Sequence, residues 1–326
     1  SFSGNGIPKW DVSSVTDMAY MFYGAKSFNC DLSQWDVSSV TSMNRMFNGA
    51  LSFNSHLSKW DVSSVTSMDG MFGSATSFNG DLSDWDVTSV LTMRGMFDGA
   101  TSFDGDVSKW DVSGGRRGIR MEYMFNSATS FNGDLSEWDV SRVISTHSMF
   151  YEATSFNGDL SKWDVSSVTS MVKMFSRATT FNNDISKWDV SSVTSMQQMF
   201  YLATTFNGDL SKWDVSSVIN MFAMFEVASS FNIDLSKWDV SSVTDMSYMF
   251  SGATSFAWAL CGAAWVRSQA GKNNMFMGSY GSISNVCTGM APTTITAPTS
   301  IATSAPVTVA DTATTPARVT VTETAT

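Results

Sequence analysis

The chain has 326 residues, of which 43% are apolar and only 15% are charged, and its formal net charge is −11. This acidic balance argues against a nucleic-acid-binding protein, which needs a cationic surface to displace counterions from phosphates. Two histidines and three cysteines leave few side chains for metal or nucleophilic chemistry, so we do not expect an enzyme.

The N-terminal residue is Ser1 rather than methionine, and no segment with the composition of a signal peptide follows it. We therefore expect further sequence upstream of Ser1. The longest apolar run, residues 256–266, is shorter than the roughly 20 residues that a membrane-spanning helix needs. Contact with a membrane would therefore require an anchor outside this sequence.

A 25-residue repeat fills residues 1–256, with the consensus W-D-V-S-S-V-T-x-M-x-x-M-F-x-x-A-T-S-F-N-G-D-L-S-K. A three-residue insertion within residues 113–120 lengthens one step to 28. A constant period that tolerates one insertion predicts a solenoid, in which each unit stacks on its neighbours. The tryptophans that open the ten units are Trp10, Trp35, Trp60, Trp85, Trp110, Trp138, Trp163, Trp188, Trp213 and Trp238.

Each unit can be divided into elements by counting positions from its tryptophan as position 1. The W-D-V segment alternates, which predicts a short strand with Trp and Val facing inward and Asp facing solvent. Apolar residues at positions 6, 9, 12, 13 and 16 have helical spacing, and the preceding serines could cap a short helix. The sequence thus predicts a right-handed, curved α/β solenoid of the leucine-rich-repeat kind. A β-solenoid whose outer arc contains only turns or 3₁₀ segments is the alternative.

The repeat W-D-V-S-S-V-T-x-M-x-x-M-F…S-F-N-G-D-L, over roughly residues 7–256, resembles that of BspA-like leucine-rich-repeat surface proteins. These are also described as the mycoplasma-lipoprotein-type repeat family. The resemblance implies a secreted or cell-surface protein that adheres to other cells or to matrix. The family shares no enzymatic activity, so the resemblance implies neither catalytic residues nor a cofactor.

Two further segments follow the repeats. Residues 257–290 diverge from the consensus, and we expect them to cap the open end of the solenoid. Cys261 and Cys287 bracket this cap, and we interpret them as a disulfide, with two buried thiols as the alternative; Cys30 is expected to be a lone thiol. Residues 291–326 are rich in Thr, Ala and Pro, which predicts a disordered stalk, glycosylated or plain.

Aspartate at position 2 is present in every unit and would form a periodic acidic column along the solenoid. Neighbouring aspartates in this column would repel one another. We expect lysine at position 25, present in most units, to offset this repulsion, and we expect each aspartate to accept a hydrogen bond from the serine two residues later in an Asx turn. Binding of calcium or of a repetitive surface by this column is the alternative. Its members are Asp11, Asp36, Asp61, Asp86, Asp111, Asp139, Asp164, Asp189, Asp214 and Asp239.

Positions 10, 11, 14 and 15 vary freely between units, and we expect them on the exposed side of the predicted helix. Apolar and aromatic residues gather there in neighbouring units and could form a partner-binding patch. The alternative is that these positions vary because no function constrains the residues on this surface. The candidate patch consists of Tyr151, Tyr201, Leu202, Phe222, Val227 and Tyr248.

Together these features predict a non-enzymatic extracellular or cell-surface protein that binds or adheres through an extended surface. The expected partner is a protein or glycan on another cell or in the matrix, not a nucleic acid. The alternative function is a structural matrix or wall component that binds a repetitive polymer or mineral, with calcium as a possible aid.

Overall fold

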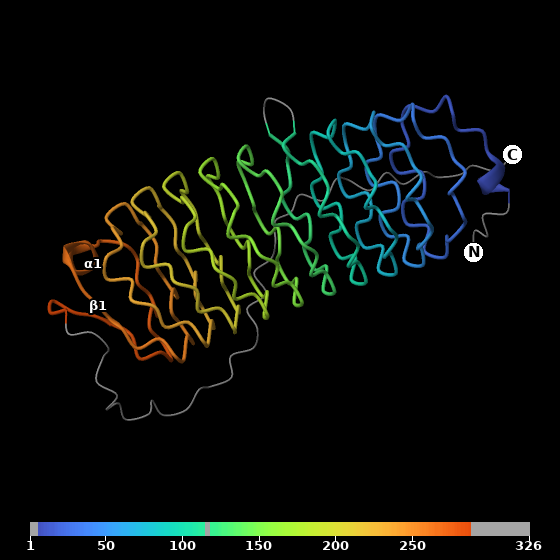
Figure 1. Ribbon diagram of the computed structural model, residues 1–326. Helices are drawn as coiled ribbons and strands as arrows, with labels where there is room; N and C mark the ends of the chain where they lie inside the picture. The colour runs from blue at the N-terminus through green and yellow to red at the C-terminus, as the bar shows by residue number, and fades with distance from the viewer. Residues whose placement is uncertain (1–5, 115–117, 288–326) are drawn as a thin grey trace, which may run out of the picture. The chain divides into compact units, whose positions relative to one another are not determined.

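The computed structural model describes residues 6–114 and 118–287 (Figure 1). The chain divides into the units Ser1–Thr293 and Thr294–Thr326. The predicted stalk, residues 291–326, lies outside the described residues. Regular elements are few in the described part: the 3₁₀ turn η1 (Ile7–Lys9), strands β1 (Ala259–Leu260) and β2 (Ser282–Ile283), and helix α1 (Ala263–Arg267). No described helix has the length and apolar character that crossing a membrane requires.

Each repeat forms one coil, and successive coils lie side by side in chain order (Figure 1). Backbone hydrogen bonds join residues one repeat apart: the Thr66 N–H donates to the Thr41 carbonyl at 2.9 Å, and the Met68 N–H donates to the Thr92 carbonyl at 2.9 Å. Isolated parallel bridges pair the residues at position 8, for example Ser67 with Thr92. The lateral pairing is therefore centred on position 8 and not on the predicted W-D-V strand.

The segment from position 9 to position 16, expected to be a helix, is a run of turns in the described repeats. Amide groups at positions 12, 14 and 16 bond three residues back, as in Met199 to Met196, whereas those at positions 9, 11, 13 and 15 bond to the next coil. Positions 11 and 15 have left-handed backbones even where they are not glycine, with φ of 54° at Gln198 and 57° at Leu202. Left-handed residues interrupt an α-helix, so the apolar spacing reflects tight turns, as in the alternative considered above.

The interior is one apolar cluster that continues from coil to coil. The predicted inward orientation of Trp and Val is confirmed, because Trp60 and Val62 are 3% and 1% exposed, whereas Asp61 faces solvent. The Trp60 ring stacks between those of Trp35 and Trp85, with centroids 6.3 and 6.5 Å away. From Trp35 to Trp238 each repeat indole also donates to a carbonyl of the preceding coil: Nε1 of Trp60, for example, donates to the Leu32 carbonyl at 3.0 Å. These two contacts give the stack its register.

The segment after the last repeat keeps part of the repeat's architecture. Trp265 of α1 takes the place of the repeat tryptophan, donating from Nε1 to the Leu235 carbonyl at 2.9 Å. Strands β1 and β2 pair in parallel, with Ala259 opposite Ser282. The predicted disulfide between Cys261 and Cys287 is confirmed, with the two Cα atoms 5.3 Å apart.

Two adjacent glutamines test the turn geometry directly. Gln198 has a left-handed backbone and Gln197 does not, and both side chains are half-buried. Glycine relieves a left-handed strain of about 1–2 kcal/mol at the cost of about 0.5–1 kcal/mol of chain entropy. We therefore expect Gln198→Gly to stabilise the protein by about 0.5 kcal/mol and Gln197→Gly to destabilise it by a similar amount, as measured by urea unfolding. Equal destabilisation by both changes would indicate a helix instead.

Candidate functional site

The predicted acidic column is exposed along its whole length. At each of its ten members, Oδ1 accepts the backbone N–H of the residue two positions later, which confirms the predicted Asx turn. At Asp189, for example, the N–H and hydroxyl of Ser191 donate to Oδ1 at 3.0 and 2.6 Å. Aspartates at position 22 form a second column with the same turn, as at Asp81 and Ser83. The sequence therefore encodes two parallel rows of carboxylates.

The lysines at position 25 act on the second column, contrary to the expectation that they would offset the first. At Asp106 the Ser108 hydroxyl and N–H lower the carboxyl pKa most, and the Lys109 charge lowers it further. At Asp189 the Ser191 hydroxyl and N–H lower the pKa, whereas the neighbouring Asp214 raises it. At Asp189, hydrogen bonds from serine rather than lysine charges thus lower the carboxyl pKa.

This dependence on serine gives a testable titration. Because the Ser191 bonds lower the pKa of Asp189 in the folded protein, their contribution to stability is present above the unfolded pKa, about 3.9, and is lost as pH falls through the folded pKa. We expect Ser191→Ala to raise the pKa of Asp189, as measured by carboxyl NMR titration. Ser192→Ala, which changes the adjacent serine, should leave that pKa unchanged. An unaltered titration in Ser191→Ala would show that the hydroxyl bond has no effect.

A conventional metal centre is not apparent in the described part of the chain. Within residues 6–114 and 118–287, no three His, Cys, Asp or Glu side chains converge in a way that could hold a metal ion. Any cation bound by the acidic columns would therefore bridge a periodic row rather than fill a compact site.

Asparagine at position 20 forms an exposed ladder along the stack. The Oδ1 atom of Asn54 accepts the Asn79 N–H of the next coil at 2.9 Å. Both residues are exposed. This column is therefore occupied by contacts that hold adjacent coils together.

The variable positions 10, 11, 14 and 15 lie together on one surface, here named the turn face. All six predicted patch residues lie there, and all are half-buried rather than fully exposed. The Phe222 and Tyr248 rings meet edge to face, 5.8 Å apart. The Arg177 guanidinium lies 5.7 Å from the centroid of the Tyr201 ring. Along the turns these half-buried pairs flank a buried pair at positions 12 and 13, as at Met199 and Phe200.

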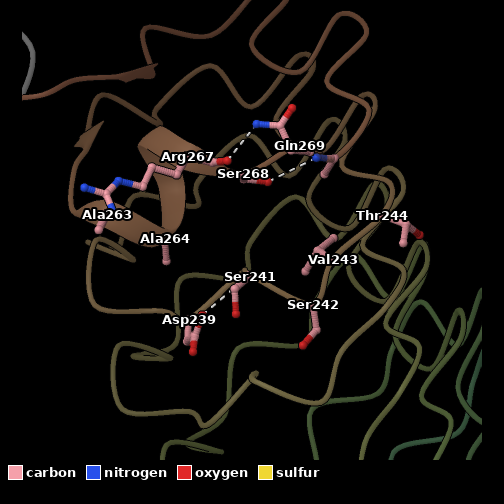
Figure 2. Close-up of a pocket in the computed structure, with 11 residues that line it drawn as sticks. Asp239, Ser241, Ser242, Val243, Thr244, Ala263, Ala264, Arg267, Ser268 and Gln269 are labelled. Atoms are coloured by element: carbon pink, nitrogen blue, oxygen red, sulfur yellow. Dashed lines mark hydrogen bonds between the residues drawn. The ribbon is translucent and has the colours of Figure 1, made fainter.

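The sequence did not predict a hollow of about 690 Å³ between the last repeat and the cap. Figure 2 shows Ser241, Ser242 and Val243 on the repeat side, with Ala264 of α1 and Ser268 on the other side. Lys272 Nζ donates to the Ser268 carbonyl at 2.6 Å and closes the cap loop. One departure from the repeat pattern could have indicated this hollow. The cap sequence after Trp265 is V-R-S-Q-A-G, whereas a repeat has D-V-S-S-V-T at the same place.

The repeat that builds these surfaces also identifies the family. Comparison with curated proteins gives no match. The model of one family, described as "Mycoplasma protein of unknown function, DUF285", matches residues 1–110, 80–186 and 171–286. These three overlapping matches extend over most of the chain, and the protein therefore belongs to the DUF285 family.

Proposed function

We propose that this protein is a non-enzymatic binding protein of the cell surface or extracellular space. In this proposal the coils form a leucine-rich-repeat-like solenoid of the BspA-like kind, and the turn face contacts a protein on another cell or in the matrix. A protein is the favoured partner because aromatic residues and arginine are enriched in protein interfaces. Tyr201, Phe222, Tyr248 and Arg177 supply these residue types together.

The observation that carries the proposal is the contrast between fixed and variable columns. Each fixed column has a role inside the stack: Trp in the core, Asn in the ladder between coils, and Asp in the Asx turns. The turn face keeps its backbone bonds while its side chains change from coil to coil. A surface free to vary in this way can be adapted to a partner without disturbing the stack.

An extracellular location is supported by the bond between Cys261 and Cys287. Such disulfides persist in oxidising surroundings and are rare in the reducing cytosol.

The test is a binding array of matrix proteins and glycans, probed with the full chain and with variants. We expect one or more proteins to bind, and Tyr201→Ser together with Phe222→Ser to weaken that binding at least about tenfold, in the range for interface anchors. Ile219→Ser is the matched control, because Ile219 belongs to the same repeat as Phe222 and is 49% exposed at position 7. Binding that survives the double change, or the absence of any protein partner, would contradict the proposal.

A periodic ligand for the acidic columns is the second candidate function. It is favoured by the exposure of both columns and by the Asx bonds, which use Oδ1 alone. Under this alternative, Asp164→Asn, Asp189→Asn and Asp214→Asn together would abolish binding to a polymer or mineral surface, and a chelator would mimic the change. If the triple variant still binds, and if the unaltered protein still binds in the presence of a chelator, this alternative is excluded.

A further inference from the structure

A second feature of the turn face lies toward the N-terminal end of the stack. It is a hollow of about 240 Å³, here named the polar hollow, that spans four neighbouring coils. Its floor contains Gly70 and Gly95, which occupy position 11 in two consecutive repeats. Its walls are formed by Arg45, Asn48, Asp69, Arg94, Asp98 and Tyr123.

The two glycines lack the side chain that other coils carry at position 11. The backbone alone does not require glycine, because the same left-handed position carries Gln198 and Lys173 in other coils, with φ of 54° and 57°. A Cβ atom at Gly95 would lie 3.4 Å from the Asp98 Cβ and 3.9 Å from the Tyr123 Cβ. A side chain at this position would therefore extend among the walls of the hollow. At Gly70 a Cβ atom would lie 3.2 Å from Arg45 Cγ, so this glycine makes room for the Arg45 side chain, whereas Gly95 leaves space beside Asp98 and Tyr123.

The charges around the hollow are already paired in part. The Asp69 Oδ1 atom accepts the backbone N–H of Arg94 at 2.8 Å and also the Thr92 hydroxyl, neither of which carries a charge. Arg94 Nε lies 3.2 Å from Glu122 Oε2. Asn48 Nδ2 donates to the Gly70 carbonyl at 3.3 Å, and the Arg45 guanidinium lies 5.9 Å from the centroid of the Tyr20 ring. The carboxyl of Asp98 completes the wall. Because opposite charges balance, the lining favours a neutral ligand over a free anion or cation.

Asp98 adds a group suited to a neutral partner. Desolvation raises its pKa to about 6. The side chain still keeps a solvent-exposed surface, so water screens part of this effect. A carboxyl beside an amide and a guanidinium offers both acceptors and donors. Hydroxyl groups, which donate and accept at once, match such a lining.

The volume limits the ligand to one small ring. At about 30 Å³ for each water in the liquid, the polar hollow has room for about eight waters. This is below the range of about 300–1,000 Å³ typical of sites for drug-sized molecules. We propose that the polar hollow binds a single saccharide ring, as the terminal unit of a glycan, through hydrogen bonds to Arg45, Asn48 and Asp98 beside Tyr123. The site is separate from the Tyr201 region of the turn face, so either proposal can fail alone.

The test uses saturation-transfer NMR on the full chain with a panel of free neutral monosaccharides, and with glycine as a zwitterion and acetate as an anion. We expect transfer to at least one monosaccharide and none to glycine or acetate. Gly95→Gln should fill the hollow without disturbing the backbone, because glutamine already occupies this position at Gln198. It should weaken saccharide binding at least about tenfold, as should Asp98→Ala, which removes polar contacts in the site.

Lys173→Gln is the matched control, because it places glutamine at position 11 of a coil that does not line the hollow. It should bind saccharide as the unaltered protein does. The thermal unfolding of each variant is measured alongside, so that loss of binding is not confused with loss of folding. The proposal is overturned if no monosaccharide gives transfer, if glycine or acetate binds instead, or if a folded Gly95→Gln protein binds normally.

Discussion

Replacement of Trp60 by alanine is expected to lower the free energy of unfolding by about 3–5 kcal/mol, the range for large-to-small changes at buried aromatic sites. The Trp60 ring is 3% exposed and stacks on Trp35 and Trp85 at 6.3 and 6.5 Å. Its Nε1 bond to the Leu32 carbonyl would also be lost, although that carbonyl would still accept the Trp35 N–H at 3.1 Å. Urea unfolding followed by circular dichroism measures the change.

Trp10→Ala provides the matched control. Trp10 occupies the same repeat position but is 51% exposed, and the stacking contact it makes is with Trp35 at 6.5 Å. The expected loss is therefore much smaller, near the 0–1 kcal/mol of most surface changes. If the two variants unfold at the same urea concentration, the tryptophans do not form an internal stack.

Removal of the cap disulfide is expected to have an effect of similar size. Cys261 and Cys287 are separated by 26 residues, and closing a loop of that length stabilises the folded state by about 3.5 kcal/mol in the chain-entropy estimate. The double change Cys261→Ala and Cys287→Ala should therefore destabilise the cap by about this amount. Unfolding in urea with and without a reducing agent measures it.

The control uses the third cysteine. Cys30 is half-buried in the first coil of the stack and is not part of the disulfide. Cys30→Ala should keep the sensitivity to reducing agent, and the double variant should lose it. Equal sensitivity of both variants would show that the reducing agent acts elsewhere.

The stacking of the repeats was predictable because the signal recurs. One tryptophan means little, but the spacing of Trp35, Trp60 and Trp85 places the same core residue in successive coils. The alternation of Trp60, Asp61 and Val62 likewise gave the correct inward and outward faces. These predictions depend on burial, which the pattern of apolar residues encodes directly.

The path of the backbone was less predictable. Met196, Met199 and Phe200 have the spacing of a helix, but tight turns bury residues at the same intervals. The deciding feature is a left-handed backbone at positions 11 and 15, which Gln198 and Leu202 adopt although neither is glycine. Glycine at the same positions in other repeats, such as Gly70 and Gly99, was the available signal.

The candidate surfaces were predicted in part. The acidic column and the turn face could be located by comparing repeats, but half-burial of residues such as Tyr201 depends on turns that the sequence does not reveal. The polar hollow was missed because part of its lining is glycine, at Gly70 and Gly95. Candidate sites in a sequence are recognised by their reactive side chains, and a glycine has none.

The insertion within residues 113–120 interrupts one step of the lateral pairing, because the parallel bridges at position 8 join Thr92 to Arg120 and Ser145 to Ser170 but, among the described residues, do not join Arg120 to Ser145. The Met93 N–H still donates to the Arg120 carbonyl at 2.8 Å, and Trp138 Nε1 still reaches the Val107 carbonyl at 2.9 Å. The turn between positions 4 and 7 is therefore a site at which a foreign sequence can be inserted. A peptide tag, an epitope or a fluorescent reporter spliced there would leave these two contacts in place.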